Sequence, residues 1–115
     1  MTKISIFKIG NYYKGFIFDG HASEGDLENY VCASISTLSQ TLYFTLIDKL
    51  NIPEDEIRDV QDDGYLEIEI LDKNVFNRND VQTCFEFMIK GIELIRSQYP
   101  QYLTLKVVEV QNDKI

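Results

Sequence analysis

The chain has 115 residues, of which 44% are hydrophobic, and a formal net charge of −8 at pH 7. This length and composition are typical of one packed domain, so we expect a single domain over residues 1–115. The acidic balance argues against direct nucleic-acid binding and favours a basic partner. No apolar run is long enough to cross a membrane and no signal peptide precedes the first strand, so we expect a cytoplasmic protein.

Alternating apolar residues predict an N-terminal hairpin with strands over residues 3–9 and 12–18, joined by a turn at Gly10-Asn11. Phe7 and Ile9 fall on the second face of the first strand, so that strand is either apolar on both faces or bulged. A polar, glycine-containing loop over residues 19–27 follows.

From about Asn29 to Leu50 apolar residues recur at helical spacing, which predicts a long amphipathic helix. Its apolar stripe is Val31, Ile35, Leu38, Leu42, Leu46 and Leu50. The candidates for its N-cap are Asn29, Asp26 and Ser23.

The second half repeats the pattern. Strands are predicted over residues 56–61 and 65–71 around the turn Asp62-Asp63-Gly64, and a second long helix over residues 77–99. Asn77 or Asn79 can cap that helix, and Pro100 ends it. Its apolar stripe is Val81, Phe85, Met88, Ile92 and Ile95. A last strand covers residues 103–110, before a polar tail.

The predicted order is therefore β-β-α-β-β-α-β, an α+β class of fold. Each helix has one apolar face and each strand has one apolar side. The simplest way to bury both is a two-layer sandwich, with both long helices on one face of a mostly antiparallel or mixed sheet.

The loop before the first helix carries the only histidine, His21, and Cys32 follows near the predicted helix start. A free thiol with an ordinary pKa of about 8.5 is only a few per cent ionised at neutral pH, so a nucleophilic cysteine needs help. If Asn29 caps the helix, Cys32 lies in the first turn, whose free N–H groups favour a thiolate and could hold an oxyanion. His21 could supply the base.

Other residues could support this pair. Asp19, Asp26 and Asn29 are candidates to orient His21, and Ser36 lies on the same helix face as Cys32. Without further support, a loop histidine is more often a surface residue and a helical cysteine more often a small buried hydrophobe, as we expect for Cys84. The chain has no CxxC motif and no cysteine–histidine cluster with zinc spacing, so we expect free thiols, no metal site and no cofactor.

The motif Gly20-His21-Ala22, followed after a glycine-containing loop by Val31-Cys32-Ala33 and then Ser36, resembles the ribosomal-processing cysteine protease (Prp) family. The resemblance extends over essentially the whole chain. It implies a thiol protease that acts in ribosome biogenesis, a homodimer in the cytoplasm that removes an N-terminal extension from a large-subunit ribosomal protein.

By the same resemblance, Cys32 is the nucleophile, His21 the general base and Ser36 the family's serine. We expect the loop to close over an extended substrate peptide, with Gly20, Ala22, Ser23 and Gly25 as its substrate-loop residues. Two positions depart from the family pattern. Asn29 stands where the family usually has Asp, and Leu27 where it has Gly, and the loop is one residue shorter. Either Asn29 or Asp26 could orient His21.

Two alternatives stay open. The first is a non-catalytic homodimeric binding protein of the same fold that holds a ribosomal or other basic peptide. The second, more distant, is a metal-binding loop that uses His21, Asp19 and Cys32.

Overall fold

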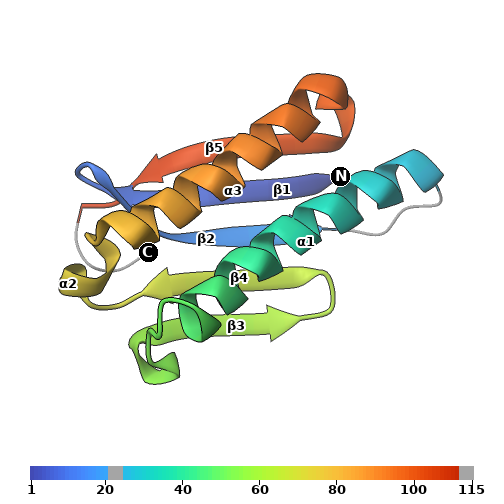
Figure 1. Cartoon of the computed structure of the whole chain (residues 1–115). Coiled ribbons are helices and arrows are strands. Elements are labelled where there is room, and N and C mark those ends of the chain that lie inside the picture. The colour runs from blue at the N-terminus through green and yellow to red at the C-terminus, as the bar shows by residue number, and fades with distance from the viewer. Residues whose placement is uncertain (21–24, 112–115) are drawn as a thin grey trace.

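The computed structural model describes residues 1–20 and 25–111, which form one five-stranded sheet with two long helices on one of its faces (Figure 1). The strands are β1 (Thr2–Ile9), β2 (Tyr12–Gly20), β3 (Ile57–Asp62), β4 (Tyr65–Ile70) and β5 (Leu103–Glu109). The helices are α1 (Asp26–Asp48), α2 (Lys73–Phe76) and α3 (Asn79–Gln98), with 3-10 turns at Glu54–Glu56 and Pro100–Tyr102. The predicted α+β class and the order of the long elements are confirmed.

The sheet is mixed, with strand order β3-β4-β2-β1-β5. Neighbouring strands are antiparallel except β1 and β5, which are parallel. The parallel pair arises because α3 carries the chain across the sheet from β4 to β5, and only a long crossover connection permits that direction.

The core lies between the sheet and the helices. The even-numbered residues Ile4, Ile6, Phe16 and Phe18 of the central strands are almost fully buried there. The helices meet them with the predicted apolar stripes, of which the fully buried members are Val31, Ile35, Leu42, Leu46, Val81, Phe85, Met88 and Ile92. Leu38, Leu50 and Ile95 lie at the edges of these stripes and are only partly buried.

The register of β1 and β2 shifts between Phe7 and Lys8, where Phe7 pairs with Gly15 and Lys8 pairs with Tyr13. The bulge therefore lies in β2 and not in β1, the strand for which a bulge was one predicted alternative, and its extra residue is Lys14. Lys14 is fully buried, and its ammonium lies 2.9 Å from Glu69 Oε2 of β4. The contact is an ion pair by distance but lies off the direction of a hydrogen bond.

The helix starts differ from the prediction. The N-cap of α1 is Gly25, so Asn29 and Asp26 lie inside the helix, and Ser23 lies outside the described residues. The N-cap of α3 is Arg78, whereas Asn79 is its first residue and Asn77 ends α2. The short α2 was not predicted, because one turn is too short to show a helical period.

Candidate active site

The end of β2 is packed directly against α1 at Cys32. A Cβ on residue 20 would lie 2.6 Å from Cys32 Sγ and 2.7 Å from Phe18 Cζ, closer than side-chain atoms approach one another. Only glycine fits at this position. The Cys32 sulfur therefore rests on the backbone of the last residue of β2, directly before His21 in the sequence.

A second glycine fixes the same backbone from the other side. The Gly20 N–H donates to the Gly64 carbonyl at 2.8 Å, and Gly64 has a φ of 72°, which favours glycine. A Cβ on Gly64 would lie 2.5 Å from the Gly20 oxygen. The predicted turn at residues 62–64 thus holds the end of β2 against the helix.

Cys32 lies in the second turn of α1, because the helix begins at Asp26. The Asn29 N–H already bonds to the Gly25 carbonyl at 3.1 Å, so the Cys32 N–H falls within the regular hydrogen bonding of the helix. The expectation that Cys32 occupies the first turn, with free N–H groups around it for an oxyanion, is wrong. The side chain itself is partly exposed.

The structure brings two of the predicted supporting residues onto the helix face of Cys32. Asn29 precedes the cysteine by one turn and is half-buried, and Ser36 follows it by one turn. Asp26 is exposed and stands off this face, since six residues rotate a helix well away from the starting direction. His21, Ala22 and Ser23 lie outside the described residues, and Gly25 caps the helix.

Sequence reasoning missed three residues near this position. Gln40 Nε2 donates to Ser36 Oγ at 2.9 Å, so the serine has a fixed partner. Gly64 provides the close backbone contact. Thr2 pairs with Gly20 across the strands, and its fully buried hydroxyl has no hydrogen-bond partner in the structure. Gly64 was visible in the sequence only as a turn signal, and the sequence gives no reason to link Thr2 or Gln40 to the site.

Cys84 has different surroundings. It lines an apolar groove between α1 and α3 with Leu38, Leu42, Phe87 and Met88. Burial, followed by the nearby carboxylate of Asp80, raises the pKa of the Cys84 thiol. This agrees with the prediction that Cys84 is a packing residue.

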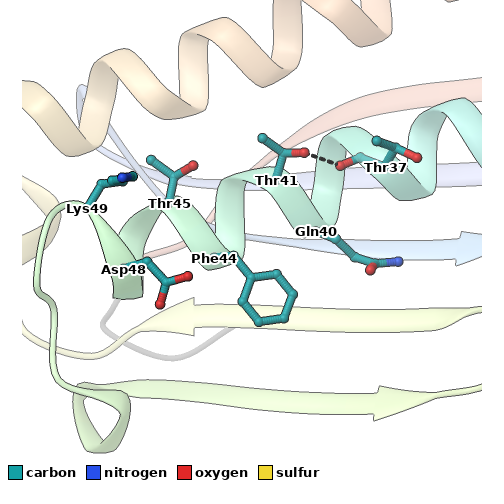
Figure 2. Close-up of a pocket in the computed structure, with 7 residues that line it drawn as sticks. All are labelled: Thr37, Gln40, Thr41, Phe44, Thr45, Asp48 and Lys49. Atoms are coloured by element: carbon teal, nitrogen blue, oxygen red, sulfur yellow. Dashed lines mark hydrogen bonds between the residues drawn. The ribbon is translucent and has the colours of Figure 1, made fainter.

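A recess of about 400 Å³ lies along the later half of α1 (Figure 2). All its lining side chains come from α1 and its C-cap Lys49, and neither cysteine is among them. No group of three metal-binding side chains occurs within residues 1–20 and 25–111. In the same ranges, neither long helix has a stretch apolar enough to span a bilayer.

Comparisons with known proteins give consistent results. No curated protein sequence matches the chain. The solved structure of SMU.848 from Streptococcus mutans superimposes with a TM-score of 0.78 at 23% identity, with 96% of each chain covered. The essential ribosomal processing protease Prp from S. aureus, solved in complex with a substrate peptide, gives a TM-score of 0.76 at 19% identity, over 94% of this chain and 100% of that chain.

At these identities the two structures show a shared fold. The sequence model of the family described as Cysteine protease Prp matches residues 1–104, which run from the first residue through the start of β5. This match includes the complete helix layer and the Gly20–Cys32 contact. The chain belongs to the cysteine protease Prp family.

Proposed function

We propose that this protein is a cysteine endopeptidase with Cys32 as nucleophile and His21 as general base. The observation that carries the proposal is the packing of Cys32 Sγ on Gly20, the residue before His21. Adjacent Cα atoms are about 3.8 Å apart, so the covalent chain itself keeps residue 21 near the thiol. That proximity is what a cysteine–histidine pair needs.

In the proposed reaction, His21 takes the thiol proton and the Cys32 sulfur attacks the carbonyl carbon of the substrate. The peptide C–N bond breaks, and the leaving amine receives the proton from His21. Water then hydrolyses the thioester and frees Cys32. Of the two candidates to orient His21, Asn29 is favoured over Asp26, because Asn29 shares the helix face of Cys32 and is half-buried.

The proposed substrate is the N-terminal extension of a large-subunit ribosomal protein, removed during ribosome assembly. The S. aureus relative is a ribosomal processing protease that has been solved with a substrate peptide and with a covalently linked product peptide. The net charge of −8 suits a basic substrate of this kind. We further propose that Gly20, Ala22, Ser23 and Gly25 contact the bound peptide, and that the enzyme acts in the cytoplasm as a homodimer.

The test is cleavage of a synthetic peptide that spans the N-terminus of the ribosomal protein from the same organism, followed by mass spectrometry. We expect Cys32→Ala and His21→Ala each to lower the cleavage rate by at least about 1,000-fold. Cys84→Ala is the matched control and should cleave at the wild-type rate. Cleavage by Cys32→Ala at the wild-type rate would refute the proposal.

One observation favours a second function. Because Cys32 lies in the second turn of α1, its own N–H is used by the helix and is not free to stabilise an oxyanion. A non-catalytic homodimer that binds a ribosomal or other basic peptide needs no such donor. That protein would bind the synthetic peptide with equal affinity before and after Cys32→Ala, and no product would form in either case.

A further inference from the structure

A small recess lies one helical turn beyond Cys32, between α1 and the β3–β4 turn. Its volume is about 80 Å³. The apolar part of its wall is Phe18 and Leu66, and the polar part is Ser36, Gln40, Asp62 and Tyr65. The turn that closes it is the one that Gly64 holds against Gly20, so the recess and the Cys32 thiol are built on the same backbone contact.

The hydroxyl of Ser36 is held differently from its neighbours on α1. Four hydroxyls on this helix donate to the carbonyl four residues earlier, namely those of Ser34, Thr37, Ser39 and Thr41. Ser36 instead accepts a hydrogen bond from Gln40 Nε2 at 2.9 Å. Its oxygen therefore keeps one lone pair that can accept a hydrogen bond from a group that enters the recess.

The mouth of the recess is negatively charged. Asp62 lines it, and one of its carboxylate oxygens accepts the Asp63 N–H at 2.8 Å, which orients the group. The only basic residue of the β3–β4 hairpin is Arg58. Its guanidinium is engaged elsewhere, 2.5 Å from Glu67 and 2.9 Å from Glu69. Among residues 1–20 and 25–111, none of those that line the recess is a cation.

The size of the recess limits what it can hold. A cavity of about 150 Å³ binds benzene, and this recess has about half that volume, so it is too small to enclose an aromatic ring but admits the end of a narrow side chain. An ammonium or guanidinium group satisfies both the charge of Asp62 and the free lone pairs of its polar wall.

We propose that this recess is a subsite for a basic side chain of the substrate peptide, with Asp62 as its charged ligand and Gln40 and Ser36 as its polar wall. The proposal rests on the proposed function, in that the peptide bond to be cut lies at Cys32. Four residues of helix rise by about 6 Å, and an extended peptide advances about 3.3 Å per residue. The basic residue therefore stands about two or three positions from the scissile bond.

The experiment measures binding, so that it does not depend on turnover. Each fluorescein-labelled octapeptide carries either lysine or norleucine at one position and a mixture of amino acids at the other positions. The peptides are titrated with the Cys32→Ala protein, and binding is measured by fluorescence anisotropy. We expect lysine to bind at least about tenfold more tightly than norleucine at one position, the size of one hydrogen bond to a charged group. Asp62→Asn keeps the acceptor for the Asp63 N–H and should reduce that ratio to under about twofold.

Asp63→Asn is the matched control. It removes the same charge from the next residue, which does not line the recess, and should leave the tenfold ratio in place. Gln40→Leu should lower the ratio by less than Asp62→Asn does. Equal binding of lysine and norleucine at every position, or an equal loss in the Asp62 and Asp63 variants, would overturn the subsite.

The same peptides, given to the protein with Cys32 intact, separate the subsite from the proposed function. Lysine preference without any cleavage would support the recess and refute the endopeptidase. Cleavage without lysine preference would refute the recess and leave the endopeptidase standing.

Discussion

The two ends of the sheet are held together by different means. At one end, on the right in Figure 1, the close of β2, the start of α1 and the β3–β4 turn meet through glycine backbone, at Gly20 and Gly64. At the other end, on the left in Figure 1, lie the β1–β2 hairpin, α2 and the start of α3. These elements are joined by hydrogen bonds of the partly buried Gln82 side chain.

The polar end has two anchors. Gln82 of α3 accepts the Tyr13 N–H at 2.9 Å and donates to the carbonyls of Tyr13 at 2.7 Å and Phe76 at 2.6 Å. The ion pair of Lys14 and Glu69, extended by Arg58, joins the bulge of β2 to β4 and β3. These contacts satisfy or neutralise groups that folding removes from water, so their loss would destabilise the fold.

At the glycine end, the contacts of Gly20 and Gly64 set the position of one sulfur atom, Cys32 Sγ. We infer that the residues that stabilise the fold and the residues that position Cys32 lie at opposite ends of the sheet. Changes at the glycine end should alter activity more than stability, and changes at the polar end should do the reverse. Each prediction below tests one side of that comparison.

The largest effect is expected at Gly20. Gly20→Ala places a methyl group against Cys32 Sγ and the Phe18 ring, so the thiol must move. Displacement of a reacting group by about 1 Å can cost about 100-fold in rate, and we expect at least that loss in peptide cleavage. Gly10→Ala is the matched control at the other end, since a Cβ there meets nothing within 4 Å. It should cost about 1 kcal/mol of stability through its φ of 58° and leave cleavage unchanged.

The largest loss of stability is expected at Glu69. Glu69→Ala leaves the fully buried Lys14 ammonium without its counter-charge, and we expect a loss of about 3 kcal/mol in urea unfolding. The double variant Lys14→Met/Glu69→Met removes both charges and should recover most of that loss. A Glu69→Ala protein as stable as wild type would mean that the ion pair is not an anchor.

Gln82→Leu should follow, with a loss of about 2 kcal/mol, because it leaves a main-chain N–H and two carbonyls of this end without their partner. Cleavage per folded molecule should not change. The exposed Gln98→Leu, at the far end of the same helix, provides the control and should unfold at the wild-type urea concentration. If fully folded Gln82→Leu protein lost its cleavage activity, the two ends of the sheet would not be independent, which would contradict the comparison.

The smallest effect is a pH dependence. The hydrogen bond from the Tyr65 hydroxyl is the main cause that lowers the pKa of Glu67, and Arg58 adds to it. A lowered carboxyl pKa stabilises the fold above the unfolded pKa, and this stability is lost as pH falls through the folded value. Glu67→Gln should therefore flatten the acid limb of a plot of unfolding free energy against pH between about 5 and 3. An identical acid limb in the wild-type and Glu67→Gln proteins would contradict a stabilising role for the Tyr65–Glu67 hydrogen bond.

The same hydrogen bond acts on the tyrosine in alkali. It raises the pKa of Tyr65 to about 12, with burial as the second cause. A raised tyrosine pKa means that its stabilising contribution is complete below the ordinary value of about 10 and is lost as pH rises toward 12. The pKa of Tyr65 is measured by the difference between the ultraviolet titration curves of the wild-type protein and of Tyr65→Phe.

Much of this fold could be predicted from the sequence, because its long elements have clear periods. The helix stripes from Val31 to Leu46 and from Val81 to Ile92 predicted which faces are buried, and the alternation around Ile68 predicted a core strand. The positions that could not be predicted depend on partners distant in the sequence. Nothing in the sequence indicates that Lys14 is buried, and only the bulge and Glu69 explain its burial.

The candidate site was predictable in its residues and not in its geometry. The spacing of His21, Cys32 and Ser36 drew attention to the end of the sheet where Gly20 contacts Cys32. The helix start was placed too late, because Gly25 caps α1 through its backbone and makes no side-chain bond that a sequence could indicate. That shift moved Cys32 from the first turn to the second and removed the expected oxyanion donors.

The most direct test of the Cys32–His21 pair is the rate at which iodoacetamide alkylates each cysteine of the folded protein at pH 7, read out by peptide mass mapping. We predict that Cys32 reacts at least about tenfold faster than Cys84, and that His21→Ala removes the difference. Equal rates at the two cysteines in the wild-type protein, or a Cys32 rate unaffected by His21→Ala, would contradict the pair.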